Sequence, residues 1–167
     1  WFFHPVASET MQDLHSLCVA DFDGDGDLDI FSGGGPMGED LYKRCFIWEN
    51  ADGIGVTWNK HEILFKQECI DAVAGDIDGD GDLDVAVNGP GSSVVNVFLA
   101  NGDGTFKAAV CYASPFTGGY QAASYLADFN KDGKLDLLSA ALSISIGNGD
   151  GSFKAPTSDQ GLYYDLE

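Results

Sequence analysis

The sequence predicts an all-β fold made of repeated units of four short antiparallel strands. Three observations lead to this prediction. A run rich in aspartate and glycine occurs three times, at residues 21–30, 76–85 and 128–137. A turn of Asn, Asp and Gly follows each run in phase, at residues 49–53, 100–106 and 147–153. No segment carries about ten residues with the apolar period of a helix.

Each unit is expected to contain the same four strands in the same order. A short apolar strand comes first, at residues 17–20, 72–75 and 124–127, and leads into the acidic run. A second strand leaves that run at residues 30–32, 85–88 and 137–139, and a β-prone third strand follows at 45–48, 94–99 and 142–146. The Asn-Asp-Gly segments are hairpin turns, because these residues accept positive φ easily. A fourth strand closes the unit at residues 56–63, at 106–112 and from 153.

Four antiparallel strands repeated about every 50 residues are typical of the blades of a β-propeller. We divide the chain into a single repeat array: residues 1–6 as the outer strand of a preceding blade, 7–64 as blade 1, 65–112 as blade 2 and 113–167 as blade 3. The third unit is short between its second and third strands, so we expect an incomplete hairpin there. Closed propellers have about four to eight blades. Three blades therefore indicate a piece of a larger propeller, closure by association, or an open stack in a fibre.

The acidic runs predict three calcium sites. Their spacing, D-x-[DN]-x-D-G-x-x-D, places side-chain oxygens at positions 1, 3, 5 and 9 and leaves the backbone carbonyl of position 7 available. Clustered like charges need a counter-ion, and a set of hard oxygen ligands suits Ca²⁺ better than Mg²⁺ or a softer metal. The expected side-chain ligands are Asp21, Asp23, Asp25 and Asp29; Asp76, Asp78, Asp80 and Asp84; and Asp128, Asn130, Asp132 and Asp136, with the carbonyls of Asp27, Asp82 and Lys134. The third site is expected to be the weakest, because its loop has fewer acidic side chains and carries a lysine.

Two other interpretations of these loops fit less well. A solvated acidic turn does not explain three in-phase copies. An EF-hand needs a glutamate at position 12 and flanking helices, but position 12 is Ser32, Val87 or Ser139 and the flanks are β-prone.

Together, the D-x-D-x-D-G-x-x-D loops and the Asn-Gly-Asp-Gly-[Thr/Ser]-Phe turns resemble the FG-GAP/VCBS repeats, over nearly the whole chain. Those repeats build integrin alpha-chain propellers and many secreted propellers, including lectins. The resemblance implies structural calcium in the loops and a glycan or protein ligand bound elsewhere, between blades or on a face. The chain lacks the Phe-Gly signature before its loops, and residues 33–36 and 88–91 only approximate the usual Gly-Ala-Pro element.

Charge and composition limit the possible partners and locations. The 167 residues include 27 Asp and Glu against 8 Lys and Arg, a net charge of -19, which argues against a nucleic-acid partner and against an anionic membrane surface. The longest weakly polar run, residues 137–147, is too short to span a bilayer, so no membrane insertion is expected. The chain begins at Trp1, so we expect that a signal, a propeptide or a larger parent was removed. The calcium prediction favours a secreted protein.

Four cysteines, Cys18, Cys45, Cys69 and Cys111, show no metal-binding spacing. They are either free buried thiols or members of one or two disulfides. An extracellular location favours disulfides, and three pairings of the four remain open.

No catalytic motif is present, and we expect a protein that is not an enzyme. His4 and His61 occupy equivalent strand positions, which suggests a repeated packing role. Tyr120 and Gln121, which follow two glycines, are candidates for an exposed ligand loop. Three functions remain open: an adhesion or binding module for a glycan or protein, a structural subunit whose open edges bind other copies, and the non-catalytic part of a carbohydrate-active enzyme.

Overall fold

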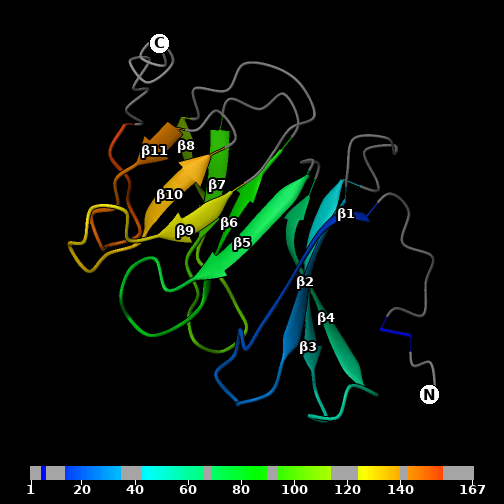
Figure 1. Ribbon diagram of the computed structural model, residues 1–167. Coiled ribbons are helices and arrows are strands. Elements are labelled where there is room, and N and C mark those ends of the chain that lie inside the picture. The colour runs from blue at the N-terminus through cyan, green and yellow to red at the C-terminus, as the bar shows by residue number, and fades with distance from the viewer. Residues whose placement is uncertain are drawn as a thin grey trace, which may run out of the picture.

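The computed structural model describes residues 5–6, 14–34, 43–65, 69–89, 94–113, 124–139 and 143–155. These residues form eleven strands in three antiparallel sheets and contain no helix, which confirms the predicted fold class (Figure 1). Within them, nothing resembles a membrane-spanning helix. Of the predicted leading strand only Pro5 and Val6 are described, and Tyr120 and Gln121 lie outside the described residues.

Each sheet follows the order of the chain, so neighbouring strands in the sequence are also neighbours in space. The strands of blade 1 are β1 (Leu14–Ala20), β2 (Asp29–Gly34), β3 (Arg44–Asn50) and β4 (Trp58–Phe65). Those of blade 2 are β5 (Asp71–Gly75), β6 (Asp84–Asn88), β7 (Val94–Phe98) and β8 (Val110–Ala113). Those of blade 3 are β9 (Tyr125–Ala127), β10 (Asp136–Ser139) and β11 (Ser143–Ser145).

The Asn-Gly-Asp-Gly turn of blade 3 is closed, whereas residues 140–142, between its second and third strands, lie outside the described residues, so the incomplete hairpin expected there stays a prediction. The N–H of Asn148 donates to the carbonyl of Ser152, as the N–H of Asn101 donates to that of Thr105 in blade 2. Beyond the turn, the described residues of blade 3 form a single bridge at Phe153 rather than a full fourth strand. The short connection between strands two and three therefore does not disturb the turn, whose hydrogen bonds are local.

The blades stack face to face, and two hydrophobic cores fill the spaces between them. Because side chains alternate along a strand, successive residues of β6 face opposite neighbours. Val85 and Val87 pack with Phe31 and Ile47 of blade 1, whereas Ala86 packs with Leu137 of blade 3. The first strands lie closest to one another, since β5 contacts both β1 and β9. This is the arrangement of adjacent propeller blades around an axis.

In the first two acidic loops, the second residue is covered by the blade that follows. The rings of Phe22 in blade 1 and Phe106 in blade 2 lie edge to face, with centroids 6.1 Å apart. Ile77 and Phe153 share the second core in the same way. Phe129 holds the equivalent position in the third loop and is 43% exposed. The phenylalanine at the end of each Asn-Gly-Asp-Gly turn is therefore an inter-blade packing residue.

Apolar side chains are exposed on the two end faces of the stack. Leu17, Val19 and Leu28 of blade 1 are exposed, whereas their counterparts in blade 2, Ala72, Ala74 and Leu83, pack against the first core. At the other end Tyr125 is 61% exposed, and its counterpart Val73 packs against the second core. Each end of the stack therefore exposes a face whose counterpart on blade 2 is covered by a neighbouring blade, as in a partial propeller.

Candidate functional site

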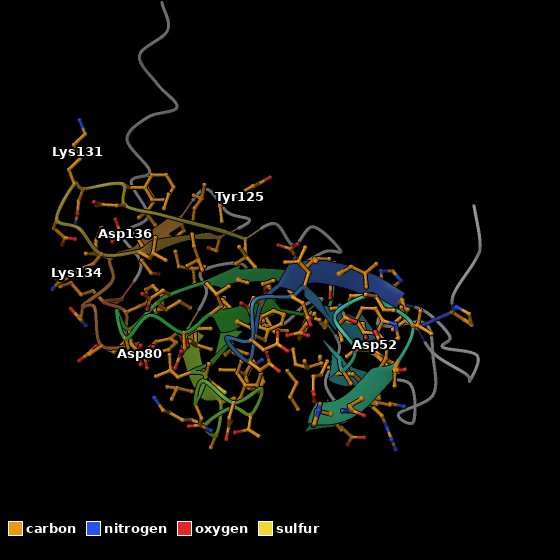
Figure 2. All side chains as sticks on the ribbon, turned by 90° about the horizontal axis from the view of Figure 1, so that it is seen from below. Asp52, Asp80, Tyr125, Lys131, Lys134 and Asp136 are labelled. Carbon is orange, nitrogen blue, oxygen red and sulfur yellow. The ribbon has the colours of Figure 1, made fainter. Side chains whose placement is uncertain are left out.

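In the first two loops, three carboxylates converge. Oxygens of Asp21, Asp23 and Asp29 all lie within 4.8 Å of one another, and those of Asp76, Asp78 and Asp84 do the same. These are positions 1, 3 and 9 of the predicted ligand sets. The position-5 residues Asp25 and Asp80 are exposed and do not belong to these groups (Figure 2 shows Asp80). No third group of acidic side chains meets this distance among the described residues, in keeping with the asparagine at position 3 of the third loop.

Two left-handed residues fold each loop around its first aspartate. In loop 1, Gly24 and Gly26 have φ of 76° and 96°, and their N–H groups donate to the two oxygens of Asp21 at 2.8 and 3.0 Å. The spacing of the sequence motif had indicated only the glycine at position 6. In the third loop position 4 is Lys131, which adopts φ of 63° without being a glycine. The third loop therefore follows the same backbone path as the other two, but its lysine adopts a left-handed conformation that costs more free energy than it does for the glycines of the other loops.

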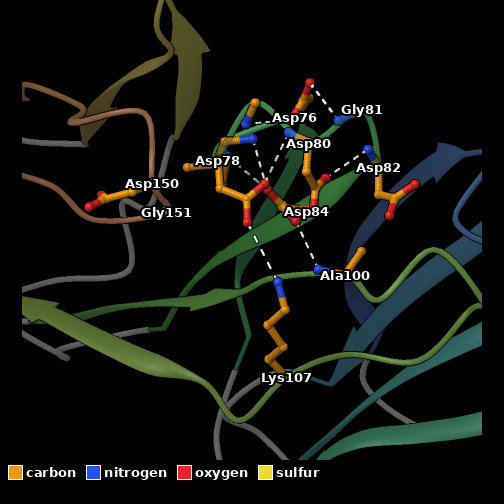
Figure 3. A network of polar contacts seen from close by, with 12 residues as sticks. Asp76, Asp78, Asp80, Gly81, Asp82, Asp84, Ala100, Lys107, Asp150 and Gly151 are labelled. Atoms are coloured by element: carbon orange, nitrogen blue, oxygen red, sulfur yellow. Dashed lines mark hydrogen bonds and ion pairs between the residues drawn. The ribbon is translucent and has the colours of Figure 1, made fainter.

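The aspartate at position 9 connects the loop to the third strand of its own blade. Asp29, Asp84 and Asp136 are 1%, 0% and 0% exposed. One oxygen of each accepts the N–H of loop position 2, at 2.9, 2.8 and 3.0 Å. The other accepts an N–H at or just beyond the end of the third strand, at 2.9, 2.8 and 2.9 Å (Figure 3 shows Asp84). The sequence predicted a metal ligand here, but this buried hydrogen-bonding role was missed.

The electrostatics of the loops favour a bound cation. Burial raises the pKa of Asp84, although hydrogen bonds from Ala100 and Ile77 act in the opposite direction. Burial also raises the pKa of Asp23, and the nearby carboxylates of Asp29 and Asp25 add to the effect. Without a counter-ion, the charged forms of these groups are therefore disfavoured.

The position-7 side chains reach the hairpin turn of the same blade. A side chain added at Gly53 or Gly102 would meet a carboxylate oxygen of Asp27 or Asp82, at 3.1 and 2.5 Å from its Cβ. In blade 3 the Nζ of Lys134 donates to the carbonyl of Asn148 at 2.7 Å. The ligand role predicted for the position-7 carbonyls stays a prediction.

The donor sets of the first two loops fit a hard divalent cation. All their side-chain donors are carboxylate oxygens, and the Oδ1 atom of Asp27 is a buried acceptor with no hydrogen-bond partner. In the third loop the amide of Asn130 donates to Oδ2 of Asp132 at 3.0 Å, so one carboxylate oxygen already accepts a hydrogen bond from a neutral side chain. This difference agrees with the weaker third site that the sequence predicts.

A hollow of about 370 Å³ lies between β4 of blade 1 and the turn region of blade 2. Its polar lining includes His61, Glu62, Thr105 and Lys107, and its aromatic lining includes Phe98 and Phe106. Nε2 of His61 lies 2.8 Å from Oε2 of Glu49, and its side chain is 40% exposed, so His61 borders this hollow instead of packing in a core. Nζ of Lys107 lies 3.6 Å from Oδ2 of Asp78, which links the hollow to the second acidic loop (Figure 3). The sequence had drawn attention to His61 but gave no role to Glu62 or Lys107.

The profile of a known family matches the two intervals that contain these loops. The FG-GAP-like repeat matches residues 21–87 and 76–139. The chain belongs to the FG-GAP-like repeat family. Each matched interval of this FG-GAP-like chain begins at the first aspartate of an acidic loop and extends through the next loop, so the motifs that predicted the family are those that define the match. No curated protein sequence matches the chain significantly.

Among solved structures, this FG-GAP-like chain is similar to a lectin from Agrocybe aegerita whose specific recognition of non-reducing terminal N-acetylglucosamine has been described. The two are 25% identical, with a TM-score of 0.58 over 84% of this chain. The chain spans 37% of that lectin chain.

Proposed function

We propose that this chain is a secreted, calcium-stabilised binding module whose ligand is a glycan. The observation that carries the proposal is the hollow between blades 1 and 2. It combines the half-buried ring of Phe106 with several hydrogen-bonding side chains, which is the composition that a sugar with apolar and hydroxyl faces requires. Similarity to a glycan-recognising lectin supports the same class of ligand. The hollow also lies between blades, where the family resemblance places ligands.

Calcium is a structural component of the proposed module. The ion neutralises the converging carboxylates of the first two loops, and with lower affinity those of the third. Because these loops connect the first and second strands of each blade, an ordered loop also holds the strands in register. Binding to the folded state alone raises stability by mass action.

The module is proposed to bind without turning over its ligand. Its most buried acidic side chains, at position 9 of the loops, use both carboxylate oxygens for backbone hydrogen bonds. A carboxylate next to a calcium ion is also a poor proton donor. A turnover assay on acidic polysaccharides tests this part of the proposal, and released reducing ends above the blank would refute it.

The glycan proposal is tested by calorimetric titration with oligosaccharides that end in non-reducing N-acetylglucosamine. Lys107→Ala is expected to weaken binding at least about tenfold, if the lysine donates to the sugar. Lys154→Ala is the matched control, because Lys154 holds the equivalent position in blade 3. No binding by the wild type, or equal losses in the two variants, would refute this use of the hollow.

The calcium proposal is tested independently by thermal melting in excess chelator and in millimolar calcium. We expect a markedly higher melting temperature with calcium. Asp78→Asn should reduce this gain, whereas Asn130→Asp should increase it by completing the third set of carboxylates. Identical melts with and without calcium would exclude a calcium role.

A second candidate function is a structural subunit that assembles through its end faces. The observation that favours it is the exposure of Leu17, Val19 and Tyr125, whose counterparts in blade 2 pack against neighbouring blades. Light scattering in millimolar calcium separates the two candidates. A mass of one chain supports the binding module, whereas a discrete oligomer or a growing filament supports the structural subunit.

A further inference from the structure

Two cysteines that are distant in the sequence meet in the core between blades 1 and 2. Cys45 lies on β3 directly opposite Gly33 of β2, and Cys69 lies just before β5. A Cβ added to Gly33 would lie 2.5 Å from the Sγ of Cys69 and 2.6 Å from its Cβ. Cys69 therefore occupies the space that the missing side chain of Gly33 leaves. That space adjoins Cys45.

Cys45 and Cys69 are free thiols that are both 0% exposed in the same hydrophobic cluster. The neighbouring Cys69 thiol raises the pKa of the Cys45 thiol. Directly opposed residues of an antiparallel pair have Cβ atoms about 4.5–5.5 Å apart, and a disulfide needs about 3.5–4.5 Å between Cβ atoms. Because the Cβ of Cys69 lies 2.6 Å from the position that a Gly33 Cβ would take, Cys69 is brought close to Cys45.

Backbone and side-chain bonds hold Cys69 in this position. Its N–H donates to the carbonyl of Gly34 at 2.8 Å, and its Sγ lies 2.8 Å from the Oγ of Ser16. Both partners belong to blade 1, whereas Cys69 leads into the first strand of blade 2. A covalent bond here would join the two blades at a place where they are already hydrogen-bonded.

We propose that Cys45 and Cys69 form a disulfide that links blade 1 to blade 2. A small-molecule disulfide such as oxidised glutathione is the two-electron acceptor. One cysteine thiolate attacks it and releases the first glutathione thiolate. The second cysteine thiolate then attacks the mixed disulfide and releases the second. Two thiol protons are lost in total and two molecules of reduced glutathione result.

The bond forms while the chain folds, before the blades close over the thiols. The neighbouring Cys69 thiol and burial raise the pKa of the Cys45 thiol, so little thiolate is available in the folded protein. The other two cysteines are less well placed. Cys18 faces Phe31, two residues along β2 from Gly33, and burial raises its pKa to about 12. Cys111 is exposed on β8 and donates to Asn96 at 3.0 Å.

The test is a disulfide map of the full chain refolded with calcium in a glutathione redox buffer. Free thiols are alkylated in denaturant, and the protein is then digested with trypsin and analysed without reductant. Lysine and arginine positions place the four cysteines in four separate tryptic peptides, 1–43, 45–60, 67–107 and 108–131. The expected result is a linked pair of the peptides 45–60 and 67–107, with alkylated Cys18 and Cys111. Four alkylated cysteines, or a bond between Cys18 and Cys69, would overturn the proposal.

Thermal melting provides a second readout. The wild type and Cys111→Ser should both melt at lower temperature after reduction, whereas Cys45→Ser should melt alike in oxidising and reducing buffer. An unchanged wild-type melt after reduction would also count against the bond. The peptide map uses the wild type alone, so it decides the question even if Cys45→Ser does not fold.

Discussion

Replacing Asp84 by asparagine tests the role of the aspartate at position 9. Its Oδ2 accepts N–H groups from Ile77 and Asp78 at 2.8 and 3.3 Å, and its Oδ1 accepts that of Ala100 at 2.8 Å. Asparagine has nearly the same size but only one acceptor oxygen. If that oxygen faces Ala100, the amide NH₂ group replaces the oxygen that accepted the other two N–H groups.

The expected loss follows from these contacts. A hydrogen bond to a charged group contributes about 1.5–3 kcal/mol, and a buried donor left unpaired costs about 1–3 kcal/mol. The contact from Asp78 is long and counts for little. Burial raises the pKa of Asp84, so removing its charge offsets part of the loss. We expect the free energy of unfolding to fall by about 2–4 kcal/mol.

Urea unfolding followed by tryptophan fluorescence measures this change, in excess chelator and in calcium. Asp80→Asn is the control, because Asp80 is exposed and its Oδ1 accepts one N–H from Asp82 at 3.0 Å, which an asparagine oxygen also accepts. It should lose little stability in chelator. If Asp84→Asn matches the wild type in chelator and is weakened only in calcium, Asp84 acts through the metal alone and the hydrogen-bonding argument is refuted.

Four further substitutions test the blade packing, the third loop and the pH dependence. Phe22→Ala should lower the free energy of unfolding by about 3–5 kcal/mol, because blade 2 covers that ring. Phe129→Ala, at the same position of the third loop, should lower it by less than about 1 kcal/mol. Equal losses of the two variants on urea unfolding would contradict the stacking of the blades. Lys131→Gly should stabilise the protein by about 1 kcal/mol, since it relieves a left-handed lysine, and an unchanged or lower melting temperature would argue against this. Burial raises the pKa of Asp71 above its usual 3.8, although the N–H of Ser124 opposes the shift. The protonated carboxyl therefore contributes its full stabilisation of the fold below pH 3.8. This contribution is lost as the pH rises through the pKa of Asp71 in the folded protein. Asp71→Asn should remove that dependence, and a difference in urea midpoint from wild type that stays constant between about pH 3.5 and about pH 7 would refute it.

The parts of the fold that depend on neighbouring residues could be predicted from the sequence. The spacing of the acidic loops along the chain predicted the number of units. The alternation of apolar and polar side chains predicted the strands within them. The turns follow from glycine and asparagine at fixed positions, since these residues accept positive φ. The converging oxygens of Asp21 and Asp23 follow from the spacing of one short loop. Each of these features requires only residues that are close together in the chain.

Other features depend on contacts between distant segments, which no local pattern specifies. The partners of Asp29, Asp84 and Asp136 in the third strands became visible only in the folded sheets. The hollow lined by His61 and Lys107 exists only because two blades meet there.

By itself, the sequence determined the repeat, the type of blade and the oxygen-rich loops, because each is encoded within about ten residues. Only the tertiary structure decided that Phe22 is covered and Phe129 exposed, although both hold the same position in equivalent loops. The same is true of Cys45 and Cys69, whose meeting depends on Gly33 of β2 and on the docking of blade 2 against blade 1. The physical reason is that burial depends on which blade comes next in space, and the residues of one repeat cannot specify that.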